Sequence, residues 1–243
     1  MNSREELLAE LMNFLGQEFR SQLVLKGGML LRLYNSSRAT KDIDYLWVSK
    51  ESGKILKDQL IKAFHTWGKV KIGEIRLNSR GVFIDIMDLE NKQKVLLEIS
   101  VVPKTYQPPI PLSTAPLSQK YQLAAQVVST MAISEAYSHK IAATLERNAP
   151  RDLYDLSQFE GMGAFDKETL TARLSKLTID RAKPQSLNFL EAAALLRKKI
   201  DNLKQENIEA ELYPLLPEEY HAGLMGLLRA SVGRLIQRLE VTT

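Results

Sequence analysis

A proline-rich segment at residues 101–116 divides the sequence into two parts with different patterns. The segment, VVPKTYQPPIPLSTAP, holds five of the nine prolines of the 243-residue chain. Proline has no backbone N–H to donate, so neither a helix nor the interior of a sheet can run through this segment. We therefore predict a domain boundary here, with one domain over residues 1–110 and a second over residues 111–243.

The part before the boundary alternates between strand-like and helical patterns. Apolar residues recur at helical spacing over residues 4–19 and 53–67, and MLLRLY resumes such a pattern. Runs rich in β-branched and aromatic residues predict strands between these helices. The predicted strands are LVLK, DIDYLWV, KIGEIRL, GVFIDIMDL and KVLLEISVV, and the last three follow one another as a meander. This order predicts an α/β domain with a mixed sheet and flanking helices.

The part after the boundary has helical patterns throughout. Apolar residues recur there at the spacing that lines one face of a helix. We expect helices at about residues 117–131, 134–147, 150–160, 166–178, 186–206 and 217–239. The predicted fold class is therefore an α/β domain followed by an α-helical domain.

Composition and charge limit the kinds of site and partner. The chain has no cysteine, which excludes disulfides, thiolate metal ligands and cysteine nucleophiles, so any metal must be bound by oxygen or histidine. The segment MNSREELLAELMNFLGQEF lacks the basic start of a signal peptide, and no apolar run is long enough to cross a membrane, so we expect a cytoplasmic protein. The net charge of +4 comes from the first 110 residues, which carry 17 basic and 13 acidic side chains. A polyanion or a triphosphate would be attracted to that part.

Two aspartates stand one residue apart in the predicted strand DIDYLWV. Side chains alternate along a strand, so Asp42 and Asp44 face the same way, with Cα atoms about 7 Å apart. Two carboxylates in one small volume repel each other unless a cation lies between them, and oxygen ligands alone favour Mg²⁺ or Mn²⁺. Such a pair also occurs at turns and solvated strand edges, so the pair by itself leaves both interpretations open.

A third acid would complete a metal site, and the neighbouring predicted strands offer candidates. Asp85 and Asp88 lie in GVFIDIMDL, where Asp85 is also explained as part of the polar face of an amphipathic strand. Glu98 interrupts the apolar run VLLEISVV, and an ionised carboxylate among buried neighbours needs a cationic partner. We predict Glu98 as the third metal ligand, and an ion pair with a lysine across the sheet is the alternative.

The predicted strand LVLK runs into two glycines that precede a helical pattern. Gly27 and Gly28 allow backbone N–H groups to close on an anion, and the start of a helix adds partial positive charge, which suits a phosphate. Lys26, Arg38 and Lys41 would supply counter-charge. Glycine pairs also serve as simple turns, so only the combination with the acids points to chemistry. Together, a phosphate-binding turn and a metal-binding strand predict nucleotidyl transfer from a nucleoside triphosphate.

The segment HKIAATLERNAPRDLYDLSQF carries a second group of charged residues. Lys140 and Arg147 are seven residues apart, two turns along one face of a helix, so both can point at one anion. Arg151 and Asp155 have the spacing of a helical ion pair, and Asp152 stands near a predicted helix start. A helix start with an ordinary Arg–Asp pair would give the same pattern, so the residues alone leave the role of this segment open.

Both segments resemble motifs of one protein family. KGGMLLRLYNSSRATKDIDYLWV is similar to the first motif of the nucleotidyltransferase-like toxins of the abortive-infection AbiEii/AbiGii family. That motif typically runs Lys-Gly-Gly-Thr-Ala-Leu, followed by an arginine, a serine or threonine, and Asp-hydrophobic-Asp. HKIAATLERNAPRDLYDLSQF is similar to the helical motif of the same family. Met29 and Leu30 stand where Thr-Ala is usual, which removes a hydroxyl beside the phosphates.

The resemblance implies a minimal nucleotidyltransferase fold with an appended helical domain, and a toxin of a toxin–antitoxin or phage-defence system whose antitoxin is encoded nearby. It implies Mg²⁺ or Mn²⁺ bound by Asp42, Asp44 and Glu98, which are also catalytic, with Lys140 and Asp152 as further catalytic residues. The nucleotide-binding residues that it implies are Lys26, Gly27, Gly28, Arg38, Lys140, Arg147 and Arg151. The implied acceptor is RNA, with the 3′ end of tRNA as the expected site and a block of translation as the result. Transfer to a protein acceptor, or a non-catalytic regulator that binds nucleotide or RNA, are the alternatives.

Overall fold

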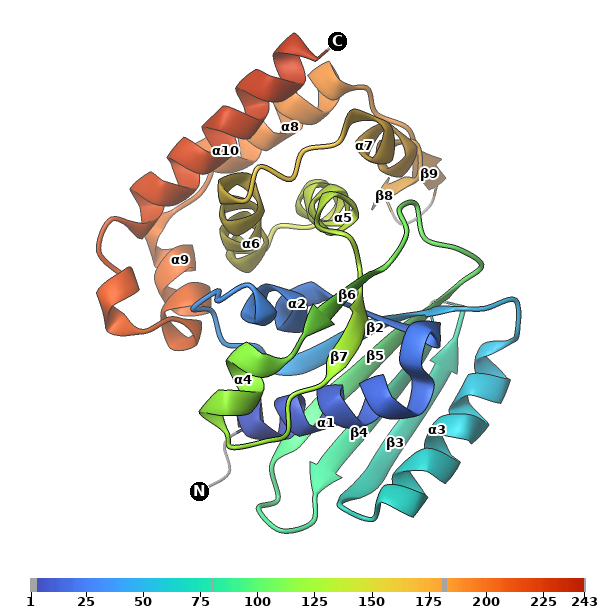
Figure 1. Ribbon diagram of the computed structural model, residues 1–243. Helices are drawn as coiled ribbons and strands as arrows, with labels where there is room; N and C mark the ends of the chain where they lie inside the picture. The colour runs from blue at the N-terminus through green and yellow to red at the C-terminus, as the bar shows by residue number, and fades with distance from the viewer. Residues whose placement is uncertain (1–3, 80, 181–182, 243) are drawn as a thin grey trace. The chain divides into compact units, whose positions relative to one another are not determined.

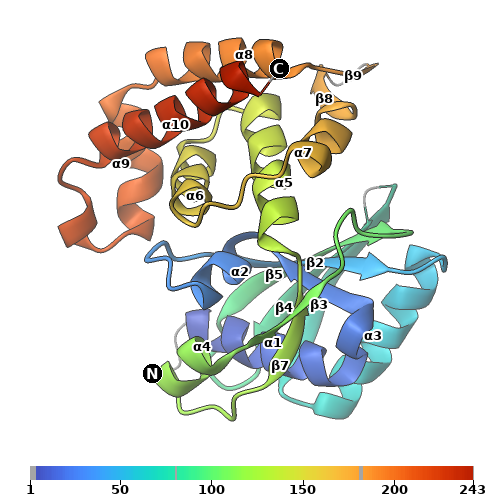
Figure 2. The same ribbon diagram turned by 45° about the horizontal axis from the view of Figure 1, so that its top comes forward.

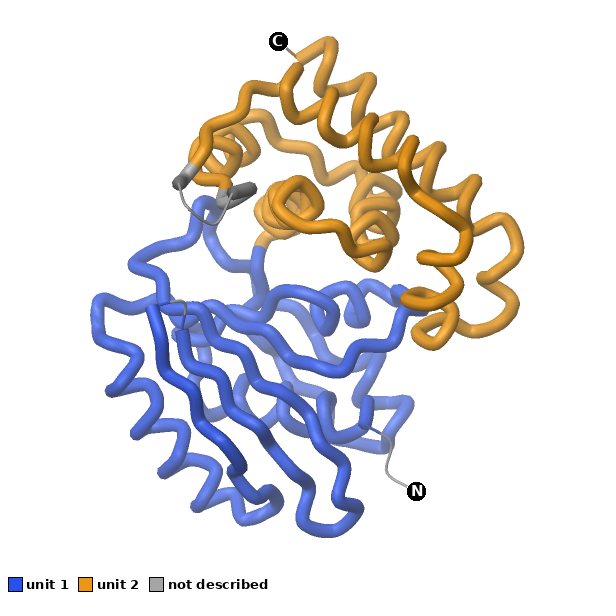
Figure 3. Tube along the Cα trace, turned by 180° about the vertical axis from the view of Figure 1, so that it is seen from behind, with its two compact units in different colours: residues 1–131 blue, residues 132–243 orange. Residues whose placement is uncertain are grey.

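The computed structural model of the chain describes residues 4–79, 81–180 and 183–242 (Figures 1 and 2). It contains two compact units, residues 1–131 and 132–243 (Figure 3). The boundary between the two units lies after residue 131, which is later in the chain than the proline-rich segment where we predicted it. The reason is that two strands after the first prolines, β6 (Ile110–Ser113) and β7 (Val127–Thr130), pair with the sheet of the first unit.

The first unit is built on a seven-stranded mixed sheet. Its other strands are β1 (Leu23–Lys26), β2 (Asp42–Val48), β3 (Val70–Asn78), β4 (Gly81–Asp88) and β5 (Lys94–Val102). The strand order is β3-β4-β5-β2-β1-β7-β6. β3, β4 and β5 form the predicted antiparallel meander, β2 pairs in parallel with β5, and β1 pairs antiparallel with β2. The predicted α/β fold with a mixed sheet and flanking helices is thereby confirmed.

Helices cover one face of this sheet. The helices of the unit are α1 (Arg4–Phe19), α2 (Gly27–Leu33), α3 (Gly53–Trp67) and α4 (Ala115–Lys120), with a short 3-10 turn at Arg20–Gln22. α1 packs against β5 and β7, and α3 packs against β3 and β4, on the same side of the sheet (Figures 1 and 2). Apolar side chains alternate with less buried ones along β4 because every second residue, Val82, Ile84 and Ile86, is buried under the helices.

The opposite face of β3, β4 and β5 is more open. Phe83 and Met87 are half-buried there, and Asp85 is exposed. Figure 3 shows this side of the three strands, which no described helix of the first unit covers. We call this side the open face of the sheet.

The core under the helices contains one tyrosine hydroxyl without a hydrogen-bond partner among the described residues. Tyr45 on β2 is 1% exposed, and burial raises the pKa of its hydroxyl. We expect Tyr45→Phe to raise the free energy of unfolding by about 1 kcal/mol, because it removes a desolvated polar group at little cost in volume. Urea denaturation of both proteins measures the difference.

Tyr121→Phe is the matched control for this substitution. The Tyr121 hydroxyl donates a hydrogen bond to Glu5, so its removal should lower the free energy of unfolding. A loss of stability in Tyr45→Phe of the same size would contradict the assignment of an unpaired hydroxyl.

The second unit is mainly helical. Its helices are α5 (Ile133–Glu146), α6 (Pro150–Gly161), α7 (Lys167–Leu174), α8 (Phe189–Asp201), α9 (Gln205–Leu212) and α10 (Leu224–Val241), with 3-10 turns at Tyr213–Leu215 and Glu218–Tyr220 and a small hairpin of β8 (Leu177–Asp180) and β9 (Lys183–Gln185). α10 packs against α6 and α8, and α5 packs against α6 and α7. No helix among the described residues combines the length and apolar character needed to cross a membrane.

The predicted helix at 117–131 is wrong beyond residue 120. Within this range, only the residues that belong to α4 are helical. The run VVST forms the strand β7, and its Thr130 is the register partner of Leu25 on β1. Valine and threonine favour an extended backbone when a neighbouring strand is available, and β1 provides that neighbour.

Helix ends in the second unit also differ from the predicted ranges. The predicted helix at 186–206 begins only at α8, where the Asn188 side chain accepts a hydrogen bond from the Glu191 N–H in a capping box, and it is interrupted before α9. The predicted helix at 217–239 begins after Gly223, whose φ of +74° ends the preceding turn. The predicted helix at 166–178 ends at Leu174, where the chain enters the hairpin.

Candidate active site

The sheet register brings the three predicted metal ligands to the open face. Asp44 on β2 is the register partner of Glu98 on β5, and Glu98 is in turn the partner of Phe83 on β4. Register partners on neighbouring strands point to the same side of a sheet, and Asp42 shares that side with Asp44 because side chains alternate. Three carboxylates from two strands therefore face the side that the helices leave open.

Asp44 lies against the glycine turn. Its Oδ1 is 3.4 Å from Lys26 Nζ, and both side chains are about one-fifth exposed. Gly27 has a φ of +70°, and a Cβ at this position would lie 2.2 Å from Asp44 Oδ2. Gly27 is therefore required twice, once for its backbone conformation and once because the carboxylate occupies the space of a side chain. The glycine pair opens α2, as the predicted strand–turn–helix order requires.

Asp42 is held by a residue that the sequence analysis did not single out. Thr40 is buried, and its hydroxyl donates a hydrogen bond of 2.6 Å to Asp42 Oδ1. A Cβ on Gly28 would lie 2.8 Å from the Thr40 hydroxyl oxygen, so the second glycine makes room for this contact. Arg38 is also buried and donates to the Ala39 carbonyl. The available signal was a threonine spaced two residues before an aspartate pair, which alone is weak.

The two other acids considered for the metal site have different roles. Asp85 lies 3.7 Å from Arg76 on the neighbouring strand. Asp88 accepts hydrogen bonds from the backbone N–H groups of Glu90 and Asn91, and so closes the turn between β4 and β5. Burial would raise the pKa of Asp88, but a hydrogen bond from the Asn91 side chain and these two backbone hydrogen bonds lower it. Asp88 is thus explained by the turn alone.

The donor chemistry at the open face suits a hard cation, since oxygen ligands are those that Mg²⁺ and Mn²⁺ prefer. Asp44 already lies beside one cation, the ammonium of Lys26. Among the residues that the structure describes, however, no three acids or histidines are gathered closely enough to hold a metal ion. Asp42, Asp44 and Glu98 are therefore aligned by register, and they are not drawn together into a closed ligand cluster.

The second unit carries a cluster of four charged residues around two buried carboxylates. Lys140 Nζ on α5 lies 3.0 Å from Asp152 Oδ1 and 2.8 Å from Asp155 Oδ2 on α6, and both carboxylates are 1% exposed. Arg147 donates to both oxygens of Asp152, with Nε at 2.5 Å and Nη2 at 2.9 Å. Arg151 lies 3.6 Å from Glu211 on α9. Asp155 therefore contacts Lys140 on the neighbouring helix, whereas Arg151, its predicted i,i+4 partner, lies against Glu211.

Electrostatics keep Asp152 and Lys140 ionised. Burial would raise the pKa of Asp152, but the charges of Lys140 and Arg147 lower it. Burial would lower the pKa of Lys140, but the carboxylates of Asp155 and Asp152 raise it. Asp152 thus orients two cations, which is a positioning role, and the exposed Arg147 side chain keeps donors available for an anion.

The sequence and the fold are similar to those of known proteins. Residues 11–229 match the family model described as nucleotidyl transferase AbiEii toxin, type IV toxin–antitoxin system. No curated protein matches the sequence. The fold is similar to that of MenT4, a nucleotidyltransferase toxin from Mycobacterium tuberculosis H37Rv, with a TM-score of 0.62 and 18% identity over 97% of this chain and 86% of that one. It is also similar to JHP933 from Helicobacter pylori, with a TM-score of 0.58 and 17% identity over 98% and 93%. Because the family model spans most of the sequence, the chain belongs to the AbiEii family of nucleotidyl transferase toxins of type IV toxin–antitoxin systems.

Proposed function

We propose that this nucleotidyltransferase acts on RNA, transferring a nucleoside monophosphate from a nucleoside triphosphate to the 3′ end of an acceptor, and that the expected acceptor is tRNA. An acceptor so modified could no longer be aminoacylated, which would block translation. The observation that supports the proposal most strongly is the alignment of Asp42, Asp44 and Glu98 on the open face beside Lys26. Family membership implies a nucleoside triphosphate as substrate and a cognate antitoxin as partner.

In the proposed reaction, the 3′-hydroxyl oxygen of the acceptor forms a bond to the α-phosphorus, and the bond from that phosphorus to pyrophosphate breaks. The hydroxyl proton leaves to solvent. The proposed ligands of Mg²⁺ or Mn²⁺ are Asp42, Asp44 and Glu98, whose side chains must draw closer together than the structure shows to share an ion. The ion would neutralise charge on the phosphates. Lys26 and the N–H groups at Gly27 and Gly28 would bind phosphate oxygens, with Arg38 supporting the turn.

The helical motif would supply further contacts to the triphosphate. Lys140, Arg147 and Arg151 are the proposed nucleotide-binding cations of the second unit. Asp152 would act by orienting Lys140 and Arg147 through the contacts described above. A guanidinium that is already oriented loses less freedom when it binds a phosphate, which strengthens the contact.

Labelled nucleotides test the proposal directly. Purified protein is incubated with total RNA, Mg²⁺ and each α-labelled nucleoside triphosphate, and RNA and protein are then separated. Label in the tRNA fraction, absent when EDTA is added, is the expected result. Label on protein would favour a protein acceptor, and nucleotide binding without turnover would favour a regulatory module. A protein that labels no RNA with any of the triphosphates would overturn the proposal.

Thr40 offers a test of how the site is held. We expect Thr40→Val to lower the rate of transfer about tenfold, because a hydrogen bond to a charged group is worth about 1.5–3 kcal/mol and its loss frees Asp42 to rotate. Thr40→Ser keeps the hydroxyl and should restore most of the rate. Single-turnover kinetics and thermal denaturation, measured on the same samples, separate this effect from unfolding. Full activity in Thr40→Val would show that Asp42 needs no such support.

A further inference from the structure

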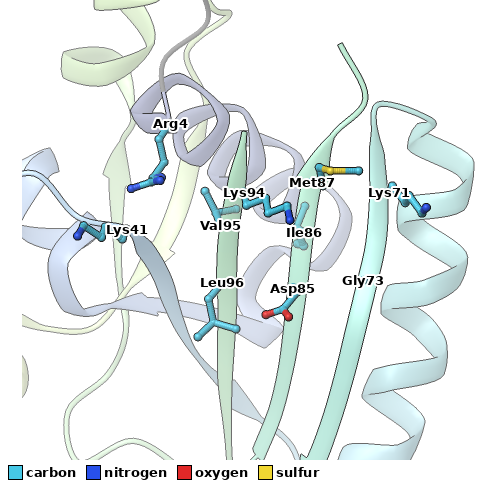
Figure 4. A pocket seen from close by; sticks show the side chains of 10 residues that line it. All are labelled: Arg4, Lys41, Lys71, Gly73, Asp85, Ile86, Met87, Lys94, Val95 and Leu96. Carbon is cyan, nitrogen blue, oxygen red and sulfur yellow. The ribbon is translucent and has the colours of Figure 1, made fainter. Parts of the chain in front are cut away.

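The open face contains a hollow of about 530 Å³ beside the aspartate pair. Figure 4 shows its lining side chains on three adjacent strands, with Arg4 coming from the start of α1 and Lys41 from the segment before β2. Lys71 belongs to β3, and Lys94 belongs to β5. All parts of this hollow lie within the first unit.

The register connects the hollow to the proposed catalytic residues. Asp42 is the register partner of Leu96, and Leu96 is the partner of Asp85. This row of register partners, which crosses the strands, leads from the aspartate pair into the hollow. The next row of register partners on this face crosses β5, β4 and β3 and consists of Lys94, Met87 and Lys71. Neighbouring strands are about 4.8 Å apart, so the surface extends about 14 Å from β2 to β3.

Basic side chains outnumber acidic ones in the hollow. The four exposed cations are Arg4, Lys41, Lys71 and Lys94, and the one lining acid, Asp85, already lies near Arg76. Within residues 4–79, 81–180 and 183–242, none of these four cations forms an ion pair. Cations spread along a surface, rather than converging on one point, match a chain of phosphates better than a single triphosphate.

The floor between the cations is apolar. Leu96 and Met87 are half-buried in the hollow. Phe83 lies outside it on the same face of β4, as the register partner of Glu98. Single-stranded nucleic acids bind to surfaces of this kind, where basic side chains contact the backbone and apolar or aromatic groups contact the faces of the bases. In double-stranded nucleic acid the faces of the bases are stacked inside the duplex, so the apolar floor would have no base face to contact.

We propose that the hollow binds the single-stranded RNA segment adjacent to the acceptor 3′ end, with Arg4, Lys41, Lys71 and Lys94 contacting its phosphates. The inference rests on the proposed function and adds the strand path: the terminal nucleotide lies at Asp42 and Asp44, and the preceding nucleotides cross β5, β4 and β3. The hollow thereby selects acceptors that end in an unpaired strand.

Two double variants with equal change in net charge test this assignment. Lys71→Glu with Lys94→Glu reverses two cations of the hollow, and Lys54→Glu with Lys62→Glu reverses two exposed lysines of α3, on the other side of the sheet. Fluorescence anisotropy of a labelled single-stranded RNA, in EDTA and without triphosphate, measures binding over a range of salt concentrations. The hollow variant should bind at least tenfold more weakly, with a salt slope lower by about 1.4 for two lost phosphate contacts.

Kinetics then separate this inference from the proposed function. For the hollow variant, the KM for RNA should rise at least tenfold while the KM for the triphosphate stays within twofold, and the α3 variant should match the wild type in both. If the wild type transfers no nucleotide but the hollow variant still binds RNA more weakly than the α3 variant, the proposed function is wrong and the assignment of the hollow as an RNA site is retained. Equal RNA affinity in the two variants would overturn the hollow as an RNA site. Loss of antitoxin binding with RNA binding intact would also overturn it, and would assign the surface to the antitoxin.

Discussion

Replacing Asp44 by asparagine is expected to lower the rate of nucleotide transfer by a factor of about 10³ or more. The substitution keeps the shape of the side chain and removes its charge from the centre of the open face, between Glu98 on β5 and Lys26 on β1. Loss of a charged ligand of this kind costs several kcal/mol of transition-state stabilisation, and about 4 kcal/mol corresponds to a factor of about 10³. Transfer of labelled nucleotide under single-turnover conditions gives the rate.

Asp58→Asn is the matched control. Asp58 is an exposed aspartate of α3, 3.4 Å from Lys57, and its substitution makes the same chemical change on the other side of the sheet. We expect its rate to stay within twofold of the wild type. An Asp44→Asn protein that keeps more than about a tenth of the wild-type rate would remove Asp44 from the catalytic residues, provided that thermal denaturation shows both variants to be folded.

Replacing Lys140 by methionine is expected to lower the free energy of unfolding by about 3–5 kcal/mol. Asp152 and Asp155 are almost fully buried, and the substitution removes the ammonium that lies between them, while Arg147 still contacts Asp152. Removing one partner from a buried ion pair strands an uncompensated charge, which costs this amount in other proteins. Urea denaturation at neutral pH measures the loss.

Two comparisons identify the cause of that loss. Arg151→Met removes a cation of the same segment from a partly exposed pair with Glu211, and should cost less than about 1 kcal/mol. Adding Asp155→Asn to Lys140→Met should recover part of the stability, because one stranded charge is then removed. If the single and double variants are equally unstable, packing rather than charge explains the effect, and activity measured on Lys140 variants must be interpreted accordingly.

The same cluster predicts a dependence of stability on pH. The folded-state pKa of Asp152 is lowered, so its contribution is fully present above the ordinary value of 3.8 and is lost as the pH falls through the folded pKa. Acid should therefore destabilise the wild type more than a protein that lacks Asp152.

Much of the first unit could be predicted from the sequence because its elements have strong local patterns. The buried alternation of β4 and the amphipathic pattern of α3 each follow from one short stretch of chain. The strand β7 could not be found in this way, because its extended conformation depends on pairing with β1, a partner about a hundred residues away. Short β-branched runs become strands only in such a context.

In the candidate site, too, the features that depend on local sequence could be predicted, and those that depend on contacts in the folded chain could not. Asp42 and Asp44 were visible because their spacing is local, and Glu98 was visible because it interrupts an apolar run. Thr40 was missed because its importance lies in one hydrogen bond to Asp42. The basic hollow was missed because its cations come from four separate stretches of sequence. The register of β3, β4 and β5 brings Lys71 and Lys94 together, and the start of α1 and the segment before β2 add Arg4 and Lys41.

The position of β5 has a consequence for synthesis of the protein on the ribosome. β5 is made after β2, β3 and β4, yet it occupies the place between β2 and β4 in the finished sheet. A nascent chain that has emerged only as far as the meander turn therefore displays Asp42 and Asp44 next to a vacant strand position, with Glu98 still to come. Chains that stop before β5 would lack Glu98, the proposed third ligand, and we expect them to transfer no nucleotide.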